Sequence, residues 1–250
     1  MGLFRRAISA FRENGFKYVL FEAFPHIHNH YIREHLWRKE TTLNGITVKS
    51  KRVGDNIVPW QSGHPEPDDY ENGIIRNLRK YVEEGDCIII VGGGWGVSTT
   101  VAASLVGPNG NVVSYEASPK QAQYTRETVA LNGVSKRVQI TNSVVSHAVS
   151  MYGSGISAHK TPPEEIPECD VLELDCEGAE TNIIENMTIR PRVVIVESHG
   201  IFDSPTEEVW EALRSAGYNI ESTELAEVGE YKEMCEERDV RVVVGTRNEN

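Results

Sequence analysis

The architecture of this chain of 250 residues can be inferred from residues 86–96, which read Asp86-Cys87-Ile88-Ile89-Ile90-Val91-Gly92-Gly93-Gly94-Trp95-Gly96. The apolar run that ends at Val91 is typical of a strand buried on both faces of a parallel sheet. The glycines that follow allow a sharp turn and let the backbone approach a ligand closely, and residues 97–106 can continue as a helix. The order of strand, turn and helix indicates an α/β fold with a cofactor site at its first turn.

The spacing of the glycines discriminates between cofactors. Gly92, Gly94 and Gly96 form a G-x-G-x-G pattern, whereas the nicotinamide fingerprint G-x-G-x-x-G would require glycine in place of Val97. Glu116 stands twenty positions beyond Gly96, at the end of the next apolar segment. A carboxylate at the end of the second strand can accept hydrogen bonds from both ribose hydroxyls of an adenosine. The turn and Glu116 therefore predict an adenosine site.

Helix-like and strand-like segments alternate from residue 68 onward, as a parallel sheet covered by helices requires. The predicted helices are 68–84, 97–106, 119–132, 179–187 and 205–216. The predicted strands are 86–91, 111–116, 137–143, 170–175, 192–197, 218–224 and 239–245. No long helix separates the last two strands, so we expect a seven-stranded, mostly parallel sheet with helices on both faces and its last strand antiparallel beside the fifth.

The first 67 residues form an N-terminal extension, and residues 68–250 form the main domain. Within residues 1–40, apolar side chains with helical spacing predict an amphipathic helix that packs on the domain or a second copy, or contacts a membrane surface: Leu3, Phe4, Ala7, Ile8 and Phe11. Residues 46–59 suggest a strand or short hairpin. The histidines between Phe24 and His30 lack the carboxylates or cysteines of a recognisable metal site.

Charge and cysteine content restrict the partners and the compartment. The chain up to Arg52 has ten basic and four acidic residues, a net charge of +6, and the remaining 15 basic and 33 acidic residues give −18. Because an acidic domain repels phosphates, a nucleic-acid partner is not expected. The four scattered cysteines follow no secretory signal and are interpreted as reduced thiols. No apolar run reaches the length of a membrane span, so we expect a cytoplasmic protein or one peripheral to a membrane.

The most specific segment for chemistry is the stretch from Asp170 to Glu180. It places Asp175 at the carboxyl end of the fourth strand, next to the first strand, where open α/β sheets bind ligands. The D-x-E-G-x-E pattern from Asp175 onward, the G-x-G-x-G turn and Glu116 together resemble the FkbM-type family of S-adenosylmethionine (SAM) dependent methyltransferases over residues 70–200. His199, after the fifth strand, resembles the acid-x-histidine ending of that family. The family usually has lysine two residues before the aspartate, where this chain has Glu173.

The resemblance implies a Rossmann-like class I methyltransferase fold, SAM as cofactor, and O-methylation of a hydroxyl, or of a carboxylate, on a small molecule or glycan. A sugar is the first choice of acceptor. The residues assigned to the cofactor are Gly92, Gly94, Trp95, Gly96, Glu116, Asn142, Ser143 and Asp175.

The catalytic candidates are Asp175, His199 and Glu177, with Asp175 or His199 taking a proton from the acceptor. Glu177 can equally be a carboxylate that stabilises the start of the following helix. We assign no metal ion, although a magnesium site formed by Asp175, Glu177 and His199 stays open. The alternatives are an inactive methyltransferase fold that serves as a binding or scaffold module and, third, a nicotinamide-dependent oxidoreductase. A homodimer is also compatible with the sequence.

Overall fold

The computed structural model describes residues 32–53, 55, 70–146, 159–202 and 204–247. These residues fall into two compact units. The first holds described residues up to Thr41 and from Lys49 to Asp55; the second holds Thr42–Val48 and the described residues from Tyr70 on. Because the predicted domain boundary after residue 67 lies among residues that the structure does not describe, it stays a prediction.

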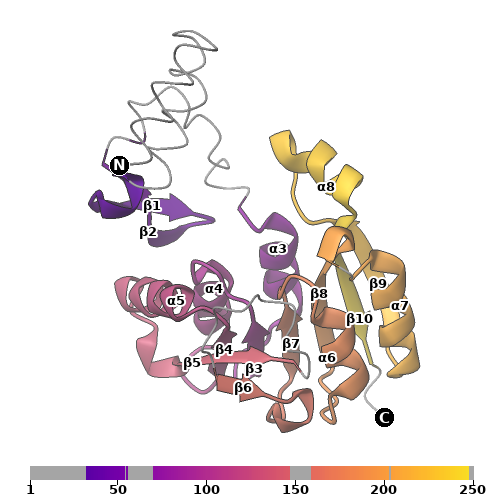
Figure 1. Cartoon of the computed structure of the whole chain (residues 1–250). Helices are drawn as coiled ribbons and strands as arrows, with labels where there is room; N and C mark the ends of the chain where they lie inside the picture. The colour runs from indigo at the N-terminus through magenta and orange to yellow at the C-terminus, as the bar shows by residue number, and fades with distance from the viewer. Residues whose placement is uncertain (1–31, 54, 56–69, 147–158, 203, 248–250) are drawn as a thin grey trace, which may run out of the picture. The chain divides into compact units, whose positions relative to one another are not determined.

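The main unit is built on a sheet with strand order β6-β5-β4-β3-β7-β8-β10-β9 (Figure 1). Its strands are β3 (Cys87–Val91), β4 (Asn111–Glu116), β5 (Val138–Val145), β6 (His159–Thr161), β7 (Val171–Leu174), β8 (Val193–His199), β9 (Asn219–Leu225) and β10 (Val240–Thr246). The pairs from β6 to β8 are parallel, and β10 runs antiparallel to both β8 and β9.

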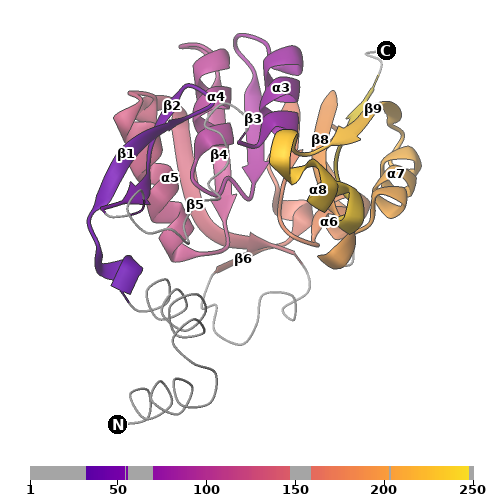
Figure 2. The ribbon, with the colours of Figure 1, turned by 90° about the horizontal axis from the view of Figure 1, so that it is seen from above.

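Two hydrophobic clusters explain why β3 is apolar almost throughout. Ile88 and Ile90 belong to one cluster, and Ile89 and Val91 belong to the other. Successive side chains of a strand point to opposite faces, so β3 is buried on both. Helices α3 (Asn72–Tyr81), α4 (Val97–Leu105) and α5 (Pro119–Leu131) lie side by side over the first cluster (Figure 2). Helices α6 (Glu180–Asn186) and α7 (Thr206–Ser215) cover the second.

Asp86 immediately precedes β3 and is buried. Its carboxylate accepts a hydrogen bond from the Glu83 amide at 2.7 Å and pairs with Arg192 at 2.5 Å. A buried carboxylate needs both a charge partner and a hydrogen-bond donor, and Asp86 has both. These contacts fix the chain at the point where it enters the sheet.

The predicted topology is confirmed, with the antiparallel last strand, β10, inserted beside the fifth predicted strand, β8. The predicted count of seven strands is one too low, because the three-residue strand β6 extends the sheet beyond β5. The prediction also lacks α8 (Lys232–Arg238), a short charged helix in which Cys235 is buried. All four cysteines are free, as expected.

The N-terminal extension is described from Ile32 on. It contains a 3-10 turn, η3 (Arg33–His35), and a two-stranded sheet of β1 (Arg38–Leu43) and β2 (Ile46–Arg52). The predicted strand or hairpin at 46–59 is therefore β2 of a hairpin whose first strand the sequence analysis missed. The predicted amphipathic helix and the run of histidines from His26 to His30 lie outside the described residues. No helix in the described ranges is long and apolar enough to cross a membrane.

The turn after β3 requires glycine at its first position. Gly92 has φ +98°, and a Cβ atom there would lie 1.8 Å from the carbonyl oxygen of Asp175, on the neighbouring strand end. Since that oxygen belongs to the backbone, no rotamer change relieves the overlap. The parallel strands β3 and β7 can approach each other at their carboxyl ends only because this residue has no side chain.

We expect Gly92→Ala to lower the free energy of unfolding by at least about 3 kcal/mol, the sum of a positive-φ penalty and a backbone overlap. The matched control is Gly133→Ala. Gly133 also has positive φ, +72°, but a Cβ atom there would meet nothing within 4 Å. The control should lose about 1 kcal/mol. Urea denaturation of both variants tests this, and equal losses would contradict the role given to the Asp175 carbonyl.

Candidate functional site

The glycine turn and strand β4 together form one wall of a cleft. The Gly92 amide donates to the Tyr115 carbonyl at 3.0 Å, and the Gly96 amide donates to the Gly93 carbonyl at 2.7 Å. Gly94 has φ +56°, and the nearest atoms to a Cβ atom there would be 3.7 Å away or more. Two backbone hydrogen bonds therefore hold this turn in place, and the side chains of Glu71 and Tyr70 are the nearest groups to its open side.

Glu116 is buried at the end of β4, with 2% of its surface exposed. It accepts a hydrogen bond from the Thr125 hydroxyl at 3.1 Å and others from the amides of Gly93 and Gly94. Burial raises the pKa of Glu116 to about 7, against the opposing effect of these donors. The carboxylate that the sequence assigned to the ribose therefore contacts the glycine turn directly.

The cleft has a volume of about 530 Å³, within the usual range for small-molecule sites. Six of the eight residues assigned to the cofactor line it: Gly92, Gly94, Trp95, Glu116, Ser143 and Asp175. Gly96 instead begins helix α4, where a Cβ atom would lie 2.8 Å from the Cα of Thr125. Because Gly96 has no side chain, the start of α4 can approach Thr125 of α5 closely.

Asn142 does not line the cleft. Its side-chain amide donates to the carbonyls of Glu116 and Ala117, at 2.7 and 3.2 Å, and so ties β5 to the end of β4. Ser143 lines the cleft, but its hydroxyl bonds the His159 carbonyl and the Thr161 hydroxyl of β6. Both side chains therefore bond to neighbouring strands. The sequence assigned them to the adenine of the cofactor, and this structural role is the alternative to that assignment.

Asp175 follows β7 directly and lines the cleft, and His199 ends the neighbouring strand β8. His199 Nδ1 lies 3.1 Å from Glu180 Oε1, and Nε2 faces Asp175 Oδ1 at 3.6 Å. Glu197 Oε1, also on β8, lies 3.5 Å from the same Nε2. The structure thus brings together the two strand ends that the sequence paired, and adds Glu197 and Glu180 to them.

The electrostatics of this cluster separate the roles of Asp175 and His199. Burial opposes the charged imidazole, but the carboxylates of Glu180 and Glu197 and the charge of Asp175 outweigh it and raise the pKa of His199 to about 11. Burial and the charge of Glu197 raise the pKa of Asp175 well above its usual range. With no metal bound, His199 is protonated at neutral pH, and Asp175 is a more basic carboxylate than an exposed aspartate.

Glu177 lines the cleft but is exposed, with φ +52°, and does not join the cluster around His199. Glu180 is buried completely, and its two oxygens accept from the amides of Cys176 and Gly178 at 3.1 and 2.8 Å. The carboxylate that fixes the loop between β7 and α6 is therefore Glu180, and Glu177 stays available to a ligand.

Several cleft residues were missed by the sequence analysis. Tyr70 and Glu71 precede α3 and line the cleft, and burial raises the pKa of Glu71 to about 8. Tyr124, on α5, stacks on Trp95 with the ring centroids 4.6 Å apart. The helical spacing of Lys120, Gln121 and Tyr124 was a usable signal, since these residues share the face of α5 that meets the cleft. No motif marks Tyr70 or Glu71.

Strand order, glycine turn and the buried acid at the end of β4 are those of the class I methyltransferase fold, whose cofactor is SAM. The residues fit that cofactor, because the cleft combines a bare backbone turn with a buried carboxylate that faces it. The family model described as "Methyltransferase FkbM domain" matches residues 156–220, so this segment of the chain is similar to that family. This segment includes Asp175, Glu180 and His199.

Solved structures with similar folds include three methyltransferases. One is a SAM-dependent methyltransferase from Aquifex aeolicus, with 18% identity, a TM-score of 0.43, and coverage of 69% of this chain and 88% of that one. Another is a precorrin-6y C5,15-methyltransferase from Geobacter metallireducens GS-15, with 14% identity, a TM-score of 0.48, and coverage of 75% and 93%.

The third is a ribosomal protein L11 methylase from Lactobacillus delbrueckii subsp. bulgaricus, with 13% identity, a TM-score of 0.47, and coverage of 72% of this chain and 80% of that one. Comparison with curated proteins finds no match. The assignment to the class rests on the strand order and on the family match.

The pKa of Glu116 predicts how SAM affinity depends on pH. Only the charged carboxylate is a full acceptor for two ribose hydroxyls, so affinity should rise as pH passes upward through about 7, by at most roughly tenfold per pH unit. Glu116→Gln should weaken binding at high pH by about 1–3 kcal/mol and remove this part of the pH dependence. Calorimetric titrations with SAM at several pH values measure both effects.

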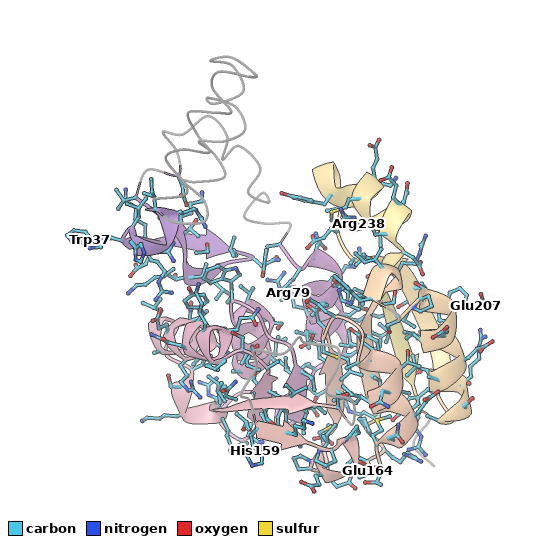
Figure 3. The ribbon with its side chains drawn as sticks, in the orientation of Figure 1. Trp37, Arg79, His159, Glu164, Glu207 and Arg238 are labelled. Atoms are coloured by element: carbon cyan, nitrogen blue, oxygen red, sulfur yellow. The ribbon has the colours of Figure 1, made fainter. Side chains whose placement is uncertain are left out.

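The control is Glu207→Gln, on the exposed side of α7 (Figure 3). It should follow the wild-type profile, including any contribution from ionisation of SAM itself. A profile that is unchanged in Glu116→Gln would remove Glu116 from the ribose site.

Proposed function

We propose that this protein is a SAM-dependent O-methyltransferase that acts on a hydroxyl, or on a carboxylate, of a small molecule or glycan, with a sugar as the preferred class. The observation that carries the proposal is the position of Asp175. Its carboxylate is 20% exposed and has a raised pKa, and it lies at the junction between the glycine turn and the protonated His199.

The residues that hold the cofactor would be the turn at Gly92 and Gly94 and the carboxylate of Glu116. When bound, SAM supplies an electrophilic methyl carbon, and the electrons of the broken carbon–sulfur bond remain on sulfur as that methyl joins the acceptor oxygen. Asp175 orients the acceptor hydroxyl and takes its proton. With no metal bound, Glu180 and Glu197 keep His199 charged, and His199 in turn holds Asp175 at the edge of the cleft. Positioning of donor and acceptor accounts for the remaining rate enhancement.

Exposed apolar residues beside His199 support an acceptor with a carbon framework. Ile201 and Phe202, in the turn η8 (Gly200–Phe202) after β8, are 52% and 45% exposed. The Phe202 ring centroid lies 6.1 Å from that of His199. An aromatic face next to a charged cluster suits a sugar, which presents both carbon–hydrogen faces and hydroxyls.

The proposal extends to partners and location. The acidic main domain disfavours a nucleic-acid substrate. The basic, amphipathic residues 1–40 would contact a membrane surface or a second copy of the chain, and the enzyme would act in the cytoplasm or at the membrane periphery, where lipid-linked sugars are accessible.

A direct test is incubation of the full chain with SAM carrying a ¹³C-labelled methyl group and a panel of sugars, uronic acids and polyketide alcohols. A labelled methoxy or methyl-ester signal in the NMR spectrum supports the proposal. SAM binding without product on any oxygen acceptor, together with methylation of a nitrogen or carbon acceptor, would reject it. SAM binding with no transfer at all would favour the inactive binding module.

We expect Asp175→Asn to reduce the rate at saturating SAM by roughly 10²–10⁴-fold while SAM affinity changes little. Asparagine keeps the volume of the side chain but removes its charge and basicity. If Asp175 served only to fix the following loop through its backbone, turnover would survive almost unchanged. Measurement of turnover and SAM affinity on the same variant separates the two roles, and near-normal turnover would contradict the catalytic assignment.

A further inference from the structure

Three potential metal ligands converge at the carboxyl ends of β7 and β8. Asp175, Glu197 and His199 each offer one ligand atom, and these atoms lie within 4.8 Å of one another. The side chains are only 20%, 14% and 10% exposed. The group therefore differs from the exposed acidic clusters that occur on many protein surfaces without any bound ion.

The distances inside the group suit a coordination sphere better than hydrogen bonds. His199 Nε2 lies 3.6 Å from Asp175 Oδ1 and 3.5 Å from Glu197 Oε1. Strong hydrogen bonds between nitrogen and oxygen are about 2.7–3.2 Å long. Ligands that surround one cation tetrahedrally at about 2.1 Å stand about 3.4 Å apart. The contacts of Nε2 with Asp175 and Glu197 are both too long for strong hydrogen bonds. A single cation bound between the three atoms would account for both distances.

The other nitrogen of His199 is oriented as in metal-binding histidines. Nδ1 lies 3.1 Å from Oε1 of Glu180, which is fully buried and fixed by the amides of Cys176 and Gly178. Histidines that ligate metals commonly donate their second ring N–H to a carboxylate, which sets the tautomer and aims the free nitrogen at the ion. In this arrangement Nε2 points its lone pair toward Asp175 and Glu197.

A further buried carboxylate next to the group has no partner. Glu173 has no exposed surface, and neither of its carboxylate oxygens has a hydrogen-bond partner. It lies in β7, two residues before Asp175, and the charge of Asp175 is among the causes that raise the pKa of Glu173. Oε2 of Glu71, which lines the cleft, is also buried without a partner. Within the described ranges, His199 is the one basic side chain paired with the carboxylates of the group.

We propose that Asp175, Glu197 and His199 bind one divalent transition-metal cation, with Glu180 as the positioning residue for His199. The nitrogen ligand favours a cation such as Mn²⁺ or Zn²⁺ over Mg²⁺, which prefers oxygen ligands and retains its water. This set replaces the magnesium set with Glu177 that the sequence left open. Three protein ligands leave coordination positions free, as in catalytic metal sites.

The open positions suggest the class of acceptor, an inference that rests on the proposed O-methylation. An acceptor with two adjacent oxygens, a vicinal diol or a hydroxy acid, can occupy them and place one oxygen beside Asp175. Oδ1 of Asp175 faces His199, so the second carboxylate oxygen remains for the acceptor. A sugar or uronic acid meets this requirement, whereas an isolated hydroxyl does not.

The test uses the full chain, stripped with a chelator and freed of it, and titrated with Mn²⁺ while the signal of free Mn²⁺ is followed by electron paramagnetic resonance. We expect one Mn²⁺ per chain, displaced by Zn²⁺ but not by an equal concentration of Mg²⁺. His199→Gln and Glu197→Gln should each weaken binding at least about tenfold, and Glu177→Gln should leave it unchanged. Circular dichroism and SAM titration establish that each variant is folded.

Absence of saturable Mn²⁺ binding to the wild-type chain would overturn the proposal, whatever the variants do. Unchanged affinity in the folded variants of His199 and Glu197, loss of binding in Glu177→Gln, or equal displacement by Mg²⁺ would overturn the assigned ligands. Because these readouts need no acceptor, they are independent of methyl transfer. Mn²⁺ binding without oxygen methylation would support the metal site and reject the proposed function. Oxygen methylation by a chain that binds no Mn²⁺ would support the proposed function and reject the metal site.

Discussion

The contact between Gly92 and the Asp175 carbonyl is the constraint on which the rest of the site depends. A Cβ atom at Gly92 would lie 1.8 Å from that oxygen, and the Asp175 amide donates to the Val91 carbonyl at 2.9 Å. The ends of β3 and β7 are therefore joined as closely as backbones allow. This junction places the turn and the carboxylate that we propose for the cofactor and the acceptor next to each other, and Glu116 contacts the same turn from β4.

The second feature of the site is an excess of buried carboxylates. Burial raises the pKa values of Glu71, Asp175 and Glu173, and His199 is the shared cation of the cluster at β7 and β8. A desolvated group of carboxylates with few counter-charges favours a bound cation, because each charge costs free energy unless it is paired. The positive sulfonium of SAM and a divalent metal ion both meet that requirement, and both would lie near Asp175.

The central part of the fold could be predicted because its signals are local. The continuous apolar runs of β3, β7 and β8 and the glycines after β3 determine the strands and the cofactor turn, and the predicted helices agree with the structure to within a few residues at most ends. The short strand β6 is polar and has no buried residue, and α8 has one buried residue, Cys235, so neither produces a periodic pattern. Two contacts of the site depend on strand pairing that no single segment encodes. Glu197 lies close to His199, and the Asn142 side chain bonds the end of β4.

The most direct test of the account is a crystal structure of the full chain with S-adenosylhomocysteine, the product of SAM after methyl transfer. We expect the two ribose hydroxyls to donate to Glu116 and the sulfur to lie beside Gly92, directed toward Asp175. A ribose bound away from Glu116, or a sulfur remote from Asp175, would contradict the claim that the junction of β3 and β7 unites the donor and the acceptor sites.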